Sequence, residues 1–274
     1  MKKRRRGTQM KQRMKVLAVA GLASVLSACA TSPTGRNQVL LYSETQMAEM
    51  GGQAFSSMKE ELKVSSKQVE NTYVQCVAKS LTPLVPDSVF NGEWEVVVFQ
   101  DDQVNAFALP GGKIGVYTGL LNVAKTQSQL AAVIGHEIGH VIAHHGNERM
   151  STSTLTNLGT QAVATAIEAN QVAYSGAIMA AIGMGSQVAI TLPFSRAHES
   201  EADLIGLALM AQAGFDPRES VELWKNMDAA SNGQRPVEIL STHPAPQSRI
   251  ENLQANMQAA MTDYQGTAKR PSCK

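Results

Sequence analysis

The sequence predicts an α+β fold that is mainly helical, with a small β-sheet beside a buried helix. Two runs rich in β-branched and aromatic residues, at 94–99 and 113–118, predict strands. From residue 200 onward the chain is helical in its periodicity. Between them, residues 127–142 carry the apolar stripe of an amphipathic helix, formed by Leu130, Val133, Ile134, Ile138, Val141 and Ile142.

Residues 1–28 predict a lipoprotein signal peptide. They contain eight lysines and arginines and no acidic residue, and an apolar stretch follows the basic region. The stretch ends Leu26-Ser27-Ala28-Cys29, which resembles a bacterial lipobox, so we expect Cys29 to be acylated. Ala30 after the cysteine favours, by analogy with bacterial sorting, the periplasmic side of the outer membrane. An ordinary signal peptide followed by a free cysteine is the alternative.

The formal charge of +1 conceals an asymmetry between this leader and the rest of the chain. Without the leader, 16 basic residues face 23 acidic ones, a formal charge of −7 for residues 29–274. Such a balance gives no reason to expect nucleic-acid binding.

After the leader, we expect residues 29–42 to be the lipid-anchored N-terminal segment and residues 43–260 to form one domain. Ser43-Glu-Thr-Gln is typical of a capped helix start, and a second helix is expected over residues 69–84. Thr126 or Ser128 is positioned to cap the helix that follows the strands.

Residues 151–195 are expected to be a lid or a packed helical insertion. Their uncharged stretch 172–192 has the length of a transmembrane segment, but it is rich in Ala, Gly and Ser. Residues 244–260 lead into a last helix, and residues 261–274 form a C-terminal tail. An oxidising compartment permits a bond between Cys76 and Cys273, but terminal tails are often disordered, so this pairing stays open.

The sequence His136-Glu137-Ile138-Gly139-His140 has the spacing H-E-x-x-H. On a helix, positions i and i+4 share a face, so both imidazoles can bind one metal ion. Glu137 is placed to take a proton from a metal-bound water. Zinc accepts nitrogen, sulfur or carboxylate ligands and keeps one position open when it is catalytic. A purely structural histidine pair is the alternative.

A third ligand is expected in the helical segment that begins near residue 196. Glu199 and Asp203 are four residues apart and share a face, whereas Glu201 points elsewhere. We expect Glu199 to be a ligand and Asp203 to orient a ligating histidine through its free N–H. A solvated acidic face is the alternative. A longer motif with a third histidine is excluded because Ala143 and Gly146 occupy the positions it requires.

Together these motifs resemble the HtpX/BepA/LoiP-like zinc metalloproteases, gluzincins with H-E-x-x-H followed by E-x-x-x-D. The segment from Val104 to Leu121 and the segment Ser241-Thr-His-Pro-Ala-Pro-Gln-Ser-Arg-Ile also resemble that family. The resemblance implies a zincin-like metalloprotease domain and a periplasmic lipoprotein member. It also implies one Zn²⁺ per chain, bound by His136, His140 and Glu199, with Glu137 as the general base.

The resemblance also makes His243 a candidate gate on the fourth zinc position or a stabiliser of the transition state. A histidine in a proline-rich loop is the alternative. Arg249 is a weaker candidate for substrate contact and could equally be an ion-pair partner. Asn105 and Phe107 lie near the expected sheet edge, where an extended substrate could pair with the strand. Turn and core roles are the alternative for these two residues.

The expected function is therefore that of a zinc endopeptidase acting on misfolded or stalled cell-envelope proteins. Acylated Cys29 would hold it on the bilayer, and the outer-membrane assembly machinery or a chaperone is a candidate partner. The alternative is a latent or non-proteolytic assembly factor for outer-membrane proteins whose zinc site is closed by His243.

Overall fold

The computed structural model describes residues 29–169, 194–231, 238–243 and 247–273, and it places helix α5 (Gln127–Ile142) at the centre of the domain. Thr126, one of the two expected caps, accepts a hydrogen bond from the backbone N–H of Gln129. Ser128 instead accepts one from the backbone N–H of Asp216. Most described elements are helices and the strands form two small sheets, so the expected α+β, mainly helical fold class is confirmed.

The expected amphipathic character of α5 was wrong in one respect. Every residue from Ser128 to Ile142 is buried, so the helix has no solvated face. The reason is its position: α3 (Gln68–Leu81) and strand β4 (Ala106–Leu109) pack against it, as do α8 (Arg196–Gln212) and α9 (Glu219–Ser231). Small and polar residues between the apolar positions therefore contact neighbouring elements.

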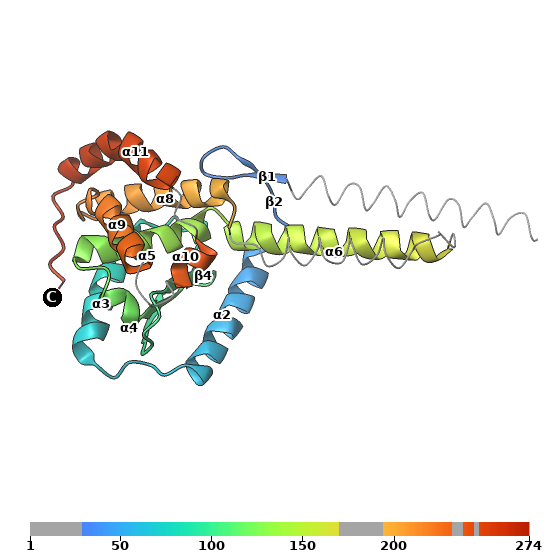
Figure 1. The fold of residues 1–274 in the computed structure, drawn as a ribbon, viewed down its shortest axis with the longest axis horizontal. Coiled ribbons are helices and arrows are strands. Elements are labelled where there is room, and N and C mark those ends of the chain that lie inside the picture. Colours follow the sequence, from blue (N-terminus) through green and yellow to red (C-terminus); the bar gives the residue numbers. More distant parts are fainter. Residues whose placement is uncertain (1–28, 170–193, 232–237, 244–246, 274) are drawn as a thin grey trace, which may run out of the picture.

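Helices α5 and α8 approach each other closely because glycines face one another at their crossing. A Cβ atom added to Gly206 would lie 2.7 Å from the backbone nitrogen of His136, and one added to Gly139 would lie 2.8 Å from the carbonyl oxygen of Ala202. Figure 1 shows α8 lying along α5, with α11 (Gln247–Gly266) covering the other side of α8. The H-E-x-x-H segment and the acidic segment of α8 are therefore held side by side.

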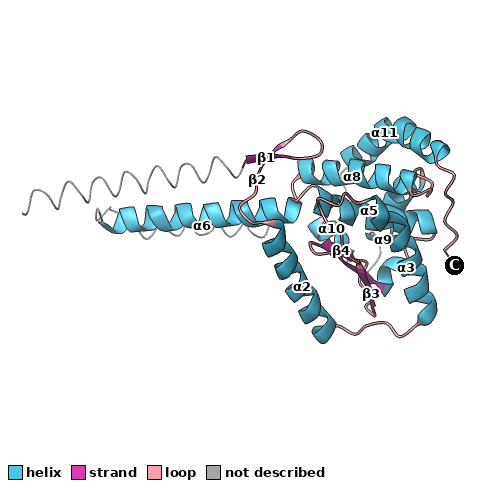
Figure 2. Ribbon diagram, turned by 180° about the vertical axis from the view of Figure 1, so that it is seen from behind, coloured by secondary structure: helices cyan, strands magenta, loops and turns pink. Residues whose placement is uncertain are grey.

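A three-stranded sheet, in the order β3-β5-β4, lies beside α5. Strand β5 (Lys113–Tyr117) pairs parallel with β3 (Glu95–Phe99) and antiparallel with β4. The hairpin between β4 and β5 turns at Gly111 and Gly112, whose φ angles of 83° and 70° suit glycine. Figure 2 shows these strands between α3 and α2 (Glu44–Glu61). Strand β4 is the edge strand that packs against α5, the helix that carries the H-E-x-x-H motif.

The expected helical and strand boundaries hold in this half of the domain. Ser43 caps α2 in a capping box with Gln46. Helix α3 is followed by a short 3-10 helix, η1 (Thr82–Leu84), which ends where we expected the second helix to end. Helix α4 (Thr118–Leu121) is a single turn between β5 and α5.

The segment before α2 is folded onto the domain as a hairpin of β1 (Cys29–Thr31) and β2 (Asn37–Val39). Its side chains reach helix α6 (His145–Ala169), where Gln38 donates a hydrogen bond of 3.0 Å to Glu148, and helix α8, where Arg36 donates one of 3.1 Å to Glu201. Residues 29–42 are thus part of the folded domain rather than only a tether.

Helix α6 (His145–Ala169) follows α5 directly and projects beyond the rest of the described domain (Figure 1). It accounts for the first part of the segment 151–195 that we expected to be a lid or packed helix. The uncharged stretch 172–192 lies outside the described residues, as does the leader 1–28. Within the described residues, every helix is too short or too polar to cross a bilayer.

The C-terminal tail is ordered, in contrast to the disorder that is common at chain ends. Helix α11 extends to Gly266, beyond the expected domain boundary, and the following residues return to α3. There Cys273 is buried and forms a disulfide with Cys76, which answers the question that the sequence left open. Gln127 supports this docking through hydrogen bonds to Pro271 and to the backbone N–H of Cys273.

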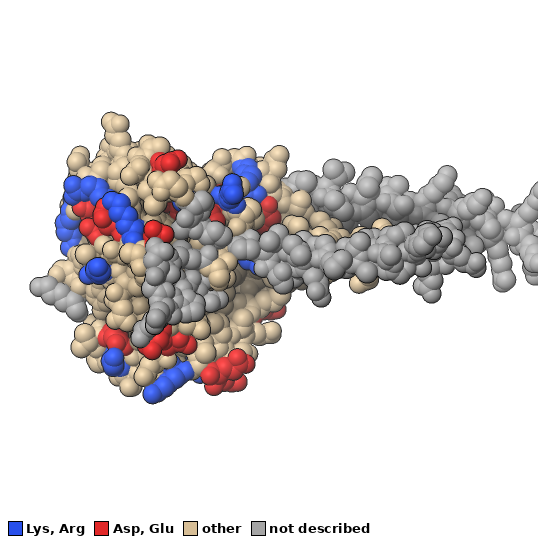
Figure 3. Space-filling view, viewed as in Figure 1, with Lys and Arg blue, Asp and Glu red and all other residues tan. Residues whose placement is uncertain are grey.

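The surface of the domain carries interspersed basic and acidic side chains on the face shown in Figure 3. The short helix α10 (Glu238–Thr242) completes the described elements and brings the residue after it, His243, toward α5.

The crossing of α5 and α8 predicts the effect of adding one methyl group. We expect Gly206→Ala to reduce the free energy of unfolding by about 1–3 kcal/mol, because the backbones must separate to admit the Cβ atom. Gly52→Ala in α2 is the matched control: its Cβ meets no atom within 4 Å, and alanine should stabilise a helix interior by up to about 1 kcal/mol. Urea unfolding followed by circular dichroism measures both. Equal stability of the two variants would contradict the proposed contact.

Candidate metal centre

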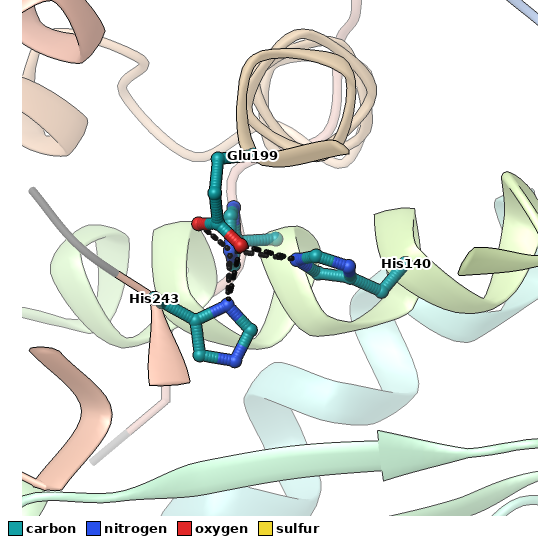
Figure 4. Close-up of side chains that lie close together, drawn as sticks. His140, Glu199 and His243 are labelled. Atoms are coloured by element: carbon teal, nitrogen blue, oxygen red, sulfur yellow. Dashed lines mark hydrogen bonds and ion pairs between the residues drawn. The ribbon is translucent and has the colours of Figure 1, made fainter. Parts of the chain in front are cut away.

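Four side chains from three elements converge next to the centre of α5. His136 and His140 come from α5, Glu199 from the first turn of α8, and His243 directly follows α10. All four are buried, and one potential ligand atom of each lies within 4.8 Å of the others. Figure 4 shows His140, Glu199 and His243 pointing toward a common centre.

The distances between these atoms fit a tetrahedral zinc site. Ligand atoms about 2 Å from a tetrahedral ion lie roughly 3.3 Å from one another. Here His136 Nε2 lies 3.1 Å from His140 Nε2 and 3.3 Å from His243 Nδ1. Glu199 carboxylate oxygens lie 3.4 Å from the Nε2 atoms of both α5 histidines and 2.9 Å from His243 Nδ1. Three imidazoles and a carboxylate are also donors that zinc prefers.

His136 is oriented by the carboxylate that the sequence singled out for this purpose. Its Nδ1 lies 3.0 Å from an oxygen of Asp203, one turn after Glu199 on α8. This contact leaves Nε2 facing the other three residues. Carboxylates in this position fix the tautomer and ring orientation of ligating histidines.

Arg249 is an ion-pair partner rather than a residue that faces a substrate. Its side chain is 2% exposed, and its guanidinium lies 2.6 Å from both Asp203 and Glu199. It also packs over the ring of Trp224 at 4.0 Å. The geometry favours the structural interpretation of Arg249, because these contacts engage both acidic residues of the E-x-x-x-D motif at once.

His140 has a support that sequence reasoning missed. Its Nδ1 lies 3.0 Å from Nδ1 of the fully buried His145, whose Nε2 lies 3.1 Å from Glu201. Glu201 in turn accepts hydrogen bonds from Thr34 and Arg36 of the N-terminal hairpin. The sequence did offer a signal, since His145 follows His140 by five residues and Glu201 follows Glu199 by two. Neither spacing identifies these contacts, because His145 begins a separate helix, α6, and Glu201 lies off the ligand face of α8.

The protonation behaviour of the cluster is dominated by burial. Burial lowers the pKa of His140 well below its usual value and raises the pKa of the Glu137 carboxyl. It would also raise the pKa of Glu199, but hydrogen bonds from the three histidines hold that pKa below its usual range. For His136, burial and the Arg249 charge are outweighed by Asp203 and Glu199, which raise its pKa to about 9. Protons therefore compete with a metal for these nitrogens.

Glu137 and His243 face each other beside the cluster. Among the described residues, Glu137 Oε1 has no hydrogen-bond donor, and His243 Nε2 lies 3.7 Å from it. The two ring nitrogens of His243 thus face the ligand cluster and the expected base. The ring of His243 also stacks on Phe194, with centroids 5.3 Å apart.

A cavity of about 260 Å³ opens next to the cluster and is the natural place for a substrate. Asn105 lines this cavity together with β4, Glu137, His140 and His243. Phe107 lines it as well, but its ring also packs with Phe55 and Phe99, in agreement with a core role. The expected edge strand, base and ligands therefore share one cavity wall.

Comparisons with known proteins agree with this geometry. Residues 68–257 match the sequence model of peptidase family M48. The mitochondrial metalloendopeptidase OMA1 of Schizosaccharomyces pombe is 34% identical over 220 residues, 80% of this chain and 62% of that protein. OMA1 of Arabidopsis thaliana is 40% identical over 173 residues, 62% of this chain and 33% of that protein.

The β-barrel assembly-enhancing protease of Escherichia coli K12 is 34% identical over 158 residues, 56% of this chain and 32% of that protein. This chain therefore spans less than two thirds of the length of each of these relatives.

The contact between Asp203 and His136 predicts weaker metal binding when the carboxylate is neutralised. We expect Asp203→Asn to lower zinc affinity about 10- to 100-fold, because the amide no longer stabilises the His136 N–H. Competition with a chromogenic chelator measures the affinity. Asp263→Asn is the control, since Asp263 is an exposed residue on α11 whose carboxylate accepts a hydrogen bond from Gln212, far along the helix from the cluster. An unchanged zinc affinity in Asp203→Asn would show that Asp203 does not support metal binding through His136.

Proposed function

This chain belongs to peptidase family M48, and we propose that it is a zinc-dependent endopeptidase. The observation that carries the proposal is the buried cluster of His136, His140, Glu199 and His243. Glu137 lies beside that cluster in the wall of the same cavity. A purely structural metal site would have no use for an additional buried carboxylate at that place.

The proposed chemistry assigns one task to each group. Zn²⁺ bound by His136, His140 and Glu199 would supply the Lewis acidity that activates water and polarises the scissile carbonyl. Glu137 takes the proton of the attacking water and passes it to the leaving amine. Its raised pKa, a consequence of burial, brings the carboxyl closer to the range in which it can both accept and donate a proton.

The substrate would bind along β4 as an extended backbone. Among the described residues, β4 pairs only with β5, so its other edge is available for backbone hydrogen bonds. The residues just before and within this strand line the cavity. Recognition through backbone groups suits unfolded segments, and we propose misfolded or stalled cell-envelope proteins as substrates. The E. coli relative, a β-barrel assembly-enhancing protease, supports this choice and makes the outer-membrane assembly machinery a candidate partner.

We place the protein on the periplasmic side of the outer membrane through an acylated Cys29. Cys29 begins strand β1 and pairs with Val39, so an anchor there would adjoin the folded domain directly. The lipobox-like sequence before it supports this proposal, although OMA1 relatives are mitochondrial. Mass spectrometry of the purified chain tests it, and an unmodified thiol at residue 29 would refute the anchor.

A latent form of the enzyme is the second candidate, and the position of His243 favours it. Its Nδ1 lies among the other potential ligand atoms, 2.9 Å from Glu199. A fourth protein ligand would fill the position that a catalytic zinc keeps open. In this form the protein would act as an assembly factor until His243 moves away.

Replacing the base separates catalysis from metal binding. We expect Glu137→Gln to retain zinc but to lose casein cleavage by about a hundredfold or more, because the amide cannot accept the proton. Metal analysis and cleavage are measured on the same sample. Glu222→Gln, a change at a half-exposed residue of α9, should leave both unchanged. Cleavage by Glu137→Gln at the native rate would contradict the role of Glu137 as the general base.

Removing His243 tests latency. If the histidine holds the site closed in nine molecules of ten, His243→Ala should raise cleavage about tenfold while weakening zinc binding. A fall in cleavage would instead assign His243 to transition-state stabilisation. The double variant Glu137→Gln/His243→Ala is the control. It should be inactive, because any cleavage gained by His243→Ala has to depend on Glu137.

A further inference from the structure

The cavity beside the metal cluster contains a cation to which the proposed chemistry gives no role. Arg149 is the fifth residue of α6, one turn beyond His145, and its partly buried side chain lines the cavity. Among the described lining residues it is the only lysine or arginine. The acidic lining residues are Glu137 and Glu44, and Glu44 lies 3.2 Å from His144 Nδ1.

Arg149 is held close to the cluster by an aromatic ring. Its guanidinium carbon lies 4.6 Å from the ring centroid of Phe194, a cation–π contact. The same ring lies 4.2 Å from the ring of His140 and 5.3 Å from that of His243. One phenyl ring therefore separates this positive charge from two of the potential metal ligands.

Within the part of the chain that the structure describes, Arg149 forms no ion pair. The two other partly or fully buried arginines among the described residues differ: Arg36 pairs with Glu148 and Glu201, and Arg249 with Asp203 and Glu199. Burial lowers the pKa of Arg149, and no carboxylate among the described side chains offsets this effect.

A partly buried guanidinium without an anionic partner costs free energy unless a ligand supplies the partner. Arginine matches a carboxylate with two parallel hydrogen bonds, and such pairs are stronger and more directional than neutral ones. The remaining wall of the cavity includes the apolar side chains of Met47, Val89, Leu109 and Val141. The cavity thus offers a largely apolar surface with one arginine near the cluster, besides the carboxylates of Glu137 and Glu44.

We propose that Arg149 selects substrates by binding a carboxylate of the peptide close to the scissile bond. The inference rests on the proposed peptidase function and adds a substrate class to it: peptides that place an acidic group beside apolar residues. The carboxylate can come from an aspartate or glutamate side chain or from a free C-terminus, and the two sources are separable by experiment.

The test measures peptide binding apart from cleavage. Fluorescent peptides bind to the full-length, zinc-loaded Glu137→Gln protein, and anisotropy gives their dissociation constants. The first set consists of amidated peptide pairs, and the two members of each pair differ by Glu or Gln at one position. The second set is one pair of peptides that carry Gln at all of these positions, one with a free C-terminus and one with an amidated C-terminus. The same peptides are measured with Arg149→Gln and Arg149→Lys added, and with Arg218→Gln as the control for a surface arginine paired with Asp216.

We expect the protein with native Arg149 to bind a carboxylate peptide about tenfold more tightly than its neutral counterpart, and Arg149→Gln to remove that preference. Arg149→Lys should keep part of it, because lysine retains the charge but not the paired hydrogen bonds. Arg218→Gln should keep all of it. A preference in the first peptide pair identifies a side chain as the source, and one in the second pair identifies the C-terminus.

Two results would overturn the inference: no preference in either peptide pair, or a preference that persists in Arg149→Gln. Zinc content and thermal unfolding of each variant are measured alongside, and Arg149→Lys decides the matter if Arg149→Gln fails to fold. Failure of the peptidase function looks different, since the zinc-loaded protein with native Glu137 would then cleave none of the peptides while the binding preference could still be present.

Discussion

The close crossing of α5 and α8 is the constraint on which the site depends. Ligands from two helices reach one ion only when the helix backbones are near each other, and here Gly135, Gly139 and Gly206 allow that approach. Glycine is costly inside a helix, by roughly 0.5–1 kcal/mol each relative to alanine. In return for this cost in helix stability, the close crossing brings Glu199 and Asp203 within reach of the histidines of α5.

The three carboxylates of α8 are each held by a group from a distant part of the chain. Arg249 of α11 pairs with Glu199 and Asp203, and Arg36 of the N-terminal hairpin pairs with Glu201. Buried carboxylates need such partners, since an unpaired buried charge is strongly destabilising. The first and last folded segments of the domain therefore stabilise the same helix from two sides, and through Asp203 and His145 they also orient the two histidines of the motif.

His243 and Arg149 give the cavity two features that a simple hydrolytic site would lack. His243 occupies a position among the potential ligands, so in the latent form that we propose a position on the metal would open only when this side chain moved away. Arg149 lies on α6, directly after the metal-motif helix, and contacts the same Phe194 ring that stacks on His243. A ligand that engages Arg149 would therefore lie next to the ring that stacks on His243.

The sequence by itself determined the parts of this protein that depend on local pattern. Hydrophobic periodicity gave helix α5 and the helical C-terminal half, β-rich runs gave β3 and β5, and helical spacing placed His136 with His140 and Glu199 with Asp203. Only the tertiary structure decided what depends on contacts between distant residues. The Cys76–Cys273 bond spans 197 residues, and the pairing of Arg36 with Glu201 spans 165. The roles of Arg249, His145 and Arg149 likewise follow from neighbours that no local spacing specifies. A side chain's periodicity tells which face of its own element it occupies, but its partners are set by how the elements pack.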